Sequence, residues 1–262
     1  MKFGMPSLIE YRSVDEHIEF CRKNNLDFLE INLTFPWYQS DRLDVRSLVR
    51  LKEESGVSYT LHFHDQLNPF DFSPELRRGS LDNVLFGLNL ARTIGAERIT
   101  MHMIRGAYSS VNGEKVHAYS VCEDEYLDHV REFMDVVDGK LDATDTIYCI
   151  ENTNGFMDFQ KDAVDIMLQN PHFGLTFDIG HNFKTSFDDE AFILSHADKL
   201  KHFHIHDVNE KSNHIALGSG IINLPKYIEM LRRYDCSAVI EVKESQALTR
   251  SLSYLRDHGV EV

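Results

Sequence analysis

Short runs of hydrophobic, β-branched and aromatic residues alternate along the whole chain with segments whose apolar residues recur at helical spacing. We expect eight strands, at residues 2–7, 27–33, 58–64, 96–103, 146–152, 173–180, 200–207 and 237–242. The alternation is typical of repeated strand–helix units with a parallel sheet. Eight such units fit a closed α/β barrel, whereas a doubly wound open sheet usually has fewer and carries a glycine fingerprint after its first strand.

Residues that begin and end helices support these boundaries. Ser13 and Glu16 form a capping-box pattern ahead of the first helical segment. Ser73 precedes Pro74, a residue that suits the first turn of a helix. Glycines follow three helical segments, at Gly56, Gly95 and Gly259. Because no linker, low-complexity tract or charged block divides the chain, the sequence predicts one domain over residues 1–262, a single (β/α)8 TIM barrel with parallel strands.

Composition and charge narrow the class of protein. Hydrophobic residues make up 42% of the chain and charged residues 26%, values ordinary for a globular protein. The net charge of −15 argues against a protein that coats nucleic acid, although a local basic face is compatible with it. We find no signal peptide, no apolar run long enough to cross a bilayer and no CxxC spacing among the four cysteines, so we expect a cytoplasmic protein with reduced thiols and no membrane partner. A homo-oligomer is compatible with the sequence, which does not specify the oligomeric state.

Residues that can bind a divalent metal lie at the ends of seven strand-like segments. They are His64, His102, Glu151, Asp178 with His181, His204, His214, and Glu241. Residues this far apart share a cation only if the fold brings the strand ends together, and the C-terminal ends of a parallel barrel ring one mouth. So many ionisable groups would repel one another without a cation, and nitrogen and oxygen ligands without thiolate favour Zn, Mn, Fe or Co. We interpret His62 and His202, which lie deeper on their strands, as hydrogen-bonded core imidazoles.

Four segments resemble the xylose-isomerase-like TIM barrel superfamily: IENTNG, FDIGHNF, HFHIHDVNE…HIALGSG and VIEVK. That group contains sugar and sugar-phosphate isomerases and epimerases and the endonuclease IV class of abasic-site repair enzymes. The resemblance implies that the metal quartet of the ketose epimerases is Glu151, Asp178, His204 and Glu241. The repair branch adds two histidines, matched by His64 and His102, and a third site of an aspartate with two histidines, matched by His181 and His214.

The chain departs from the repair branch at that aspartate, where it has Ser212. A neutral serine hydroxyl is a poor ligand, which weakens the third site. We therefore expect between one and three divalent ions, Zn or Mn, with two ions fitting the ligand set best.

Several side chains are candidates for catalysis and substrate binding. Glu151 and Glu241 could pass a proton to and from the substrate, or act only as metal ligands. His181 could bond a substrate hydroxyl, hold another ion or support a ligand. For substrate binding we name Lys243, His206 and Trp37: Lys243 could contact a phosphate or carboxylate or be a solvated lysine, and Trp37 could form an apolar wall or pack under its loop. Glu30 is interpreted as a buried barrel carboxylate without an identified partner.

The sequence thus predicts a metal-dependent isomerase or epimerase of carbohydrate metabolism, acting on a sugar, sugar phosphate or related ketose by proton transfer through a metal-stabilised enediolate. The alternative is an endonuclease IV-like phosphodiesterase that cleaves DNA at abasic sites. Ser212 weighs against it, and so does the segment 65–73, which has two aspartates and no Lys or Arg to face phosphates. We therefore expect a small-molecule sugar partner and keep nucleic acid as the alternative.

Overall fold

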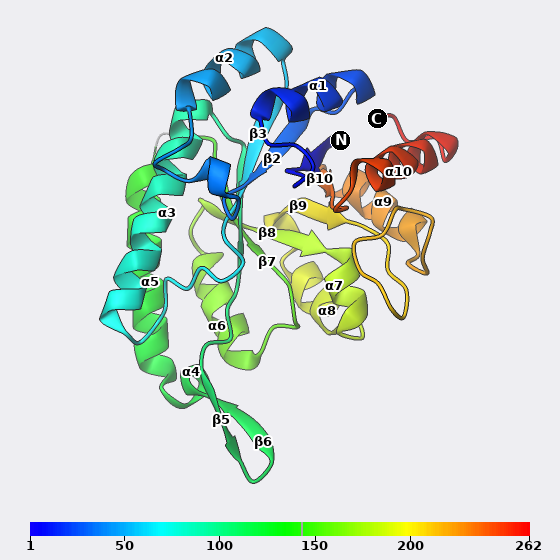
Figure 1. Ribbon diagram of the computed structural model, residues 1–262. Coiled ribbons are helices and arrows are strands. Elements are labelled where there is room, and N and C mark those ends of the chain that lie inside the picture. Colours follow the sequence, from blue (N-terminus) through cyan, green and yellow to red (C-terminus); the bar gives the residue numbers. More distant parts are fainter. Residues whose placement is uncertain (143) are drawn as a thin grey trace.

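Eight parallel strands close into a barrel in this computed structural model, which describes residues 1–142 and 144–262 (Figure 1). Around the barrel the strands follow the order β1-β10-β9-β8-β7-β4-β3-β2, so the first and last barrel strands pair directly. Their bounds are β1 Lys2–Pro6, β2 Phe28–Asn32, β3 Ser58–His62, β4 Arg98–His102, β7 Ile147–Glu151, β8 Phe173–Asp178, β9 Leu200–Ile205 and β10 Ser237–Ile240. The predicted TIM barrel is confirmed, and every strand lies within its predicted range.

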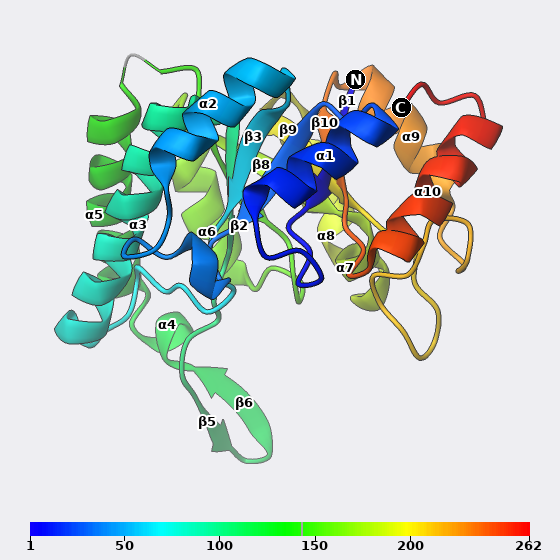
Figure 2. The ribbon, with the colours of Figure 1, turned by 45° about the horizontal axis from the view of Figure 1, so that its top comes forward.

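Helices connect successive strands and surround the barrel (Figures 1 and 2). They are α1 Val14–Asn24, α2 Val45–Ser55, α3 Pro74–Ile94, α4 Ala118–Val121, α5 Glu123–Leu141, α6 Asp158–Met167, α7 Ile179–Lys184, α8 Asp188–Ser195, α9 Leu224–Arg233 and α10 Ser245–Asp257, with 3₁₀ turns at Pro36–Tyr38 and Ala197–Lys199. The capping box of Ser13 and Glu16 is present at the start of α1. Gly56 and Gly95 adopt the left-handed conformation that ends α2 and α3. None of these helices, within the residues described, is both long and apolar enough to cross a membrane.

A two-stranded hairpin, β5 (Tyr108–Val111) with β6 (Glu114–His117), was not predicted. Both views show it projecting from the barrel on the side away from the two chain termini (Figures 1 and 2). Asn112 and Gly113 form its turn, each with positive φ, as a two-residue hairpin turn requires. The pattern of the sequence did not predict β5 and β6, because these strands are short and mostly exposed and so lack an alternation of apolar and polar residues.

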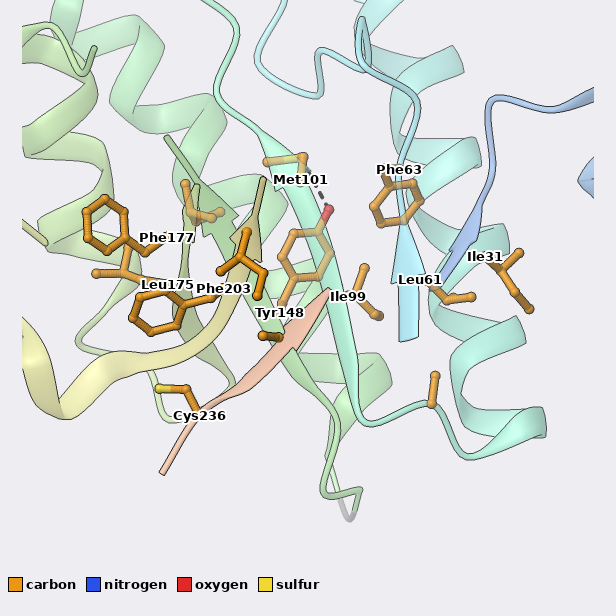
Figure 3. Packing of buried hydrophobic residues seen from close by; sticks show 14 of the residues in the cluster. Ile31, Leu61, Phe63, Ile99, Met101, Tyr148, Leu175, Phe177, Phe203 and Cys236 are labelled. Atoms are coloured by element: carbon orange, nitrogen blue, oxygen red, sulfur yellow. Dashed lines mark hydrogen bonds between the residues drawn. The ribbon is translucent and has the colours of Figure 1, made fainter. Parts of the chain in front are cut away.

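The apolar core lies between the barrel and its helices. Figure 3 shows side chains such as Leu61, Ile99, Leu175 and Phe203 on the barrel strands, and all four are almost fully buried. Each such side chain contributes about 1.5–3 kcal/mol by leaving water. Strand residues alternate in direction, so their neighbours face the barrel interior.

The barrel interior is unusually polar. Its inward positions include buried threonines, histidines and carboxylates, namely Thr60, Thr100, Thr176, His202, His204, Glu30 and Glu151. Barrel interiors are ordinarily filled by Val, Ile and Leu. The outward face therefore supplies the hydrophobic stabilisation, and the inward face carries groups capable of chemistry.

The close packing of the barrel interior gives a stability prediction. A Cβ at Gly4, on β1, would lie 2.3 Å from the Phe28 ring, so Gly4→Ala must displace a buried aromatic side chain. We expect a loss of about 1–3 kcal/mol in the free energy of unfolding, measured by urea denaturation. Gly79→Ala is the control, because nothing lies within 4 Å of its Cβ on α3, and it should gain up to about 1 kcal/mol. Equal stabilities of the two variants would contradict this packing.

Candidate metal centre

Four candidate ligands converge at the C-terminal ends of four adjacent strands. Glu151 and Asp178 end β7 and β8, His204 lies on β9, and Glu241 directly follows β10. Asp178 and His204 are paired in the barrel register. One potential ligand atom from each of the four side chains lies within 4.8 Å of the others. The predicted convergence of the quartet is therefore present in the fold.

The donor atoms of this quartet suit a divalent cation. His204 Nδ1 lies 3.2 Å from Glu151 Oε1 and 3.3 Å from Glu241 Oε2. Glu241 Oε2 and His181 Nδ1 are buried and form no hydrogen bond among the described residues, although each lies within ion-pair distance of an opposite charge, on His204 and Asp178 respectively. Buried polar atoms without a hydrogen bond are costly, and a cation would satisfy them more completely. A mixed set of carboxylate oxygens and imidazole nitrogens, without thiolate, fits Zn or Mn.

Local structure fixes the orientation of Asp178. Its Oδ1 accepts a hydrogen bond from the backbone N–H of His181 at 2.7 Å, so Asp178 is the N-cap of α7. The side chain of Asn152 donates to the Asp178 carbonyl at 3.0 Å and accepts from its backbone N–H at 2.8 Å. This clamp joins the ends of β7 and β8 and was missed in the sequence, where its only signal is its place directly after Glu151.

The glycine of the FDIGH segment is required by a close contact. A Cβ at Gly180 would lie 1.8 Å from the His206 ring. The absence of a side chain lets His206 Nε2 approach Asp178, 3.2 Å from each carboxylate oxygen. Asp178 is thus held from both sides, by its helix N-terminus and by His206.

Two further imidazoles contact Glu151, and one of them is not the histidine expected. His102 Nε2 and His62 Nε2 each lie 3.1 Å from Glu151 Oε2. The structure does not bring His64 to this cluster, because β3 ends at His62 and His64 is exposed on the following loop. Its side chain lines a separate surface pocket beside Leu67. The second metal position inferred from the sequence is therefore bordered by His62 in place of His64.

A third group consists of His206, His214 and Glu241, whose potential ligand atoms also lie within 4.8 Å of one another. Both ring nitrogens of His206 are engaged, Nε2 by Asp178 and Nδ1 by the backbone N–H of His214 at 3.3 Å. His206 is fully buried, and its predicted role in substrate binding stays a prediction. Ser212 is exposed on the same loop.

The loop that carries His214 is organised by Asp207, another residue that sequence analysis missed. Its carboxylate accepts backbone N–H bonds from Val208, Gly218, Gly220 and Ile222, at 2.8–3.1 Å. A buried carboxylate bonded in this way acts as a structural centre for the loop. No spacing in the sequence distinguishes it from a ligand, since it directly follows His206.

The other predicted substrate-binding residues occupy different surroundings. Lys243 is exposed, and its Nζ lies 2.6 Å from Glu241 Oε1. Its contact with the quartet is therefore an ion pair with that carboxylate. Trp37, on the 3₁₀ turn after β2, stacks on Phe35 with ring centroids 5.0 Å apart and packs against the core. Its indole N–H is buried without a partner among the described residues.

Charge at the mouth is balanced between carboxylates and basic side chains. Burial alone would raise the pKa of Glu151, but the charges of His204 and His102 outweigh burial and hold that pKa well below its usual range. Burial would also raise the pKa of Glu241, but the charges of Lys243 and of nearby histidines outweigh it and hold that pKa well below its usual range. The carboxylates are therefore ionised at neutral pH, as metal ligands must be.

The pKa values of two imidazoles at the mouth are raised, and that of a third is lowered. Burial would lower the pKa of His62, but its bond to Glu151 and the charge of that carboxylate raise it to about 9. Burial would also lower the pKa of His181, but nearby carboxylate charges, first that of Asp178, raise it to about 9. His214, with weaker carboxylate contact, has its pKa lowered by burial to about 4. In the metal-free protein, protons on such imidazoles supply the positive charge that the carboxylates need.

Glu30 and His202 lie beneath the quartet; the sequence predicted a hydrogen-bonded imidazole for His202 and identified no partner for Glu30. Glu30 is buried on β2, and its Oε1 lies 3.3 Å from His204 Nε2. His202 Nδ1 lies 2.7 Å from Ser237 Oγ, so this imidazole has the hydrogen bond expected of a core histidine. Buried polar side chains thus continue from the quartet into the barrel interior below it.

Comparisons with known proteins give the same fold. The sequence matches the family described as xylose isomerase-like TIM barrel over residues 17–258. It is 27% identical over 197 residues to the uncharacterized protein MJ1614 of Methanocaldococcus jannaschii, with 74% of each chain covered. A solved D-tagatose 3-epimerase-like protein superposes with a TM-score of 0.79 at 22% identity, covering 98% of this chain and 97% of that one. The IolI protein with a zinc atom bound gives a TM-score of 0.75 at 15% identity, covering 99% and 96%.

The raised pKa of His62 predicts a pH-dependent stability of the metal-free protein. This histidine has a pKa of about 9 in the folded protein, against 6.5 for an unperturbed histidine, so it stabilises the fold fully below pH 6.5 and loses that contribution as pH rises through 9. We expect the melting temperature of chelator-treated protein to fall across this window, and the fall to be smaller in His62→Gln. His258→Gln, at an exposed histidine, is the matched control and should keep the wild-type slope. An unchanged slope in His62→Gln would refute the ion pair.

Proposed function

The chain belongs to the xylose isomerase-like TIM barrel family, and from that premise we propose that it is a divalent-metal-dependent isomerase or epimerase of a sugar, sugar phosphate or related ketose. The observation that carries the proposal is the convergence of Glu151, Asp178, His204 and Glu241 at one end of the barrel. The likeness to a D-tagatose 3-epimerase-like protein supports the substrate class, and the likeness to the zinc-bound IolI protein supports a metal.

Glu151, Asp178, His204 and Glu241 would hold the first ion, and His62 and His102 with Glu151 border a second position. When bound, a divalent ion supplies Lewis-acid polarisation of the substrate carbonyl. We expect Zn or Mn, because the donors are oxygens and imidazole nitrogens.

Glu151 and Glu241 are our candidates for proton transfer. They lie at the ends of β7 and β10, the outer two strands of the four that carry the quartet, and so flank the site. A carboxylate on one side would take the proton from the carbon next to the carbonyl. Return of a proton to the opposite face of that carbon, by the other residue as a carboxylic acid, inverts the centre, and return to the former carbonyl carbon moves the carbonyl. Glu241 is the more accessible, with its side chain 13% exposed against 1% for Glu151.

His181 and Lys243 would assist at this site. His181 is partly exposed, and its buried Nδ1, without a hydrogen-bond partner among the described residues, could donate to a substrate oxygen. Lys243 holds one oxygen of Glu241 at 2.6 Å, which leaves Oε2 directed at the other ligands. In this proposal Lys243 orients Glu241 and can also meet an anionic group at the rim.

The second candidate function is a phosphodiesterase acting at abasic sites in DNA. It is favoured by His62 and His102 on Glu151, since a second ion beside the first is the arrangement used to cleave phosphodiesters. Exposed acidic residues at the rim, Asp65 among them, oppose it because they would repel phosphates.

The test is to quantify metals in purified protein and to assay the same preparation on a panel of ketoses and on a duplex with an abasic site. The proposal predicts at least one equivalent of Zn or Mn and the interconversion of one or more ketoses, lost with a chelator and restored by metal. Cleavage of the duplex at low enzyme concentration, without ketose conversion, would transfer the assignment to the second candidate.

A further prediction concerns Glu241. In Glu241→Gln the side chain keeps its shape but cannot accept a proton, so kcat for solvent proton exchange into the substrate should fall about 10²–10⁴-fold in metal-loaded protein. Glu229→Gln, an exposed carboxylate on α9, is the matched control and should behave as wild type. Exchange at the wild-type rate in Glu241→Gln with its metal retained would remove Glu241 from the proton-transfer step.

A further inference from the structure

Glu30 is a charged residue at a position where a barrel normally has an aliphatic one. It lies in the middle of β2, is 2% exposed and faces the barrel interior. An ionised carboxylate in such a place is strongly destabilising unless other groups bond to it. Its surroundings therefore indicate what it does.

The partners of Glu30 come from β3 and β9. Thr60 Oγ1 donates to Glu30 Oε2 at 3.3 Å. His204 Nε2 lies 3.3 Å from Oε1 and 3.4 Å from Oε2, nearly equidistant from the two oxygens. His202 Nε2 is farther, 3.6 Å from Oε2, and forms no hydrogen bond among the described residues. The principal partner of Glu30 is therefore the imidazole of His204.

This contact determines which nitrogen of His204 faces the quartet. An ionised carboxylate only accepts hydrogen bonds, so His204 Nε2 must carry a hydrogen. In the neutral imidazole the lone pair then lies on Nδ1, the atom 3.2 Å from Glu151 Oε1 and 3.3 Å from Glu241 Oε2. Nδ1 is thus the atom available to a cation shared with those carboxylates.

We propose that Glu30 is a positioning residue for the metal: it holds His204 as the Nε2–H tautomer, with Nδ1 directed at the ion. The inference rests on the proposed function, since it requires a metal at the quartet. A carboxylate behind a ligating histidine fixes the orientation of the ring and increases its strength as a ligand. In this proposal Glu30 acts through His204 and is not one of the four ligands of the ion.

The surroundings of this pair restrict its movement. His202 stacks edge-on against His204, with ring centroids 5.4 Å apart, and is fixed by Ser237 through the 2.7 Å contact of its Nδ1. Glu30, His202 and His204 are all buried. Water cannot readily replace the carboxylate if it is removed, so a Glu30 variant leaves His204 without a defined acceptor at Nε2.

The experiment compares wild type with Glu30→Gln and Glu30→Leu, each stripped of metal and titrated with Co²⁺ against a competing chelator. For Glu30→Leu we expect the Co²⁺ dissociation constant to rise about 10–100-fold and the d–d absorption bands of the bound ion to change. Glu30→Gln keeps an acceptor for Nε2–H but loses the charge, so its dissociation constant should lie between those of wild type and Glu30→Leu.

Thr100→Val is the matched control. Thr100 is buried in the same barrel and shares a hydrogen bond with Thr176, 3.1 Å between hydroxyl oxygens, and its neutral hydroxyl is a poor metal ligand. This variant should lose stability in thermal unfolding while keeping the wild-type Co²⁺ affinity and spectrum. The comparison separates loss of a buried hydrogen bond from loss of ligand orientation.

The outcomes are distinct. Wild-type affinity and an unchanged spectrum in both Glu30 variants would overturn this inference and leave the proposed function intact. A wild-type protein that binds no Co²⁺, Zn²⁺ or Mn²⁺ would instead overturn the proposed function, and this inference with it. If Glu30→Leu does not fold, Glu30→Gln decides alone: a weaker affinity with altered bands supports the inference, and wild-type behaviour refutes it.

Discussion

The concentration of negative charge at one end of the barrel is the constraint on which the rest of the structure depends. Glu151, Asp178 and Glu241 lie at the ends of β7, β8 and β10, and Glu30 lies beneath them. Carboxylates gathered in a largely buried site repel one another unless positive charge lies between them. In the metal-free protein histidines and Lys243 supply that charge. A divalent ion at the same place would satisfy the carboxylates more completely and release the imidazole protons.

The fold maintains this arrangement with devices outside the quartet. Asn152 joins the ends of β7 and β8, and the N-terminus of α7 fixes one oxygen of Asp178. Asp207 organises the loop that brings His214 to Glu241. The hydrophobic core lies outside the barrel, against the helices, so the interior is free to be polar (Figure 3). Stability and candidate chemistry thus occupy opposite faces of the same strands.

The sequence predicted the eight barrel strands well because alternating strand and helix patterns are local. It also predicted that the four quartet residues converge, because each lies in or directly after a clear hydrophobic run. The predicted strand ends were one or two residues too late. For β3 the prediction ended at residue 64 and the strand ends at His62, so His64 was assigned to the cluster in place of His62. The partner of Glu30 could not be predicted, because His204 is 174 residues away and the contact depends on barrel closure. The roles of Asn152 and Asp207 consist of backbone bonds, which leave no spacing signal.

The most direct measurement is X-ray diffraction from crystals soaked in Mn²⁺ or Zn²⁺, with data collected on both sides of the metal absorption edge. The account predicts an anomalous difference peak that lies within ligand distance, about 2.0–2.3 Å, of Glu151, Asp178, His204 Nδ1 and Glu241. A peak elsewhere on the molecule, or none at the quartet under saturating metal, would contradict the account.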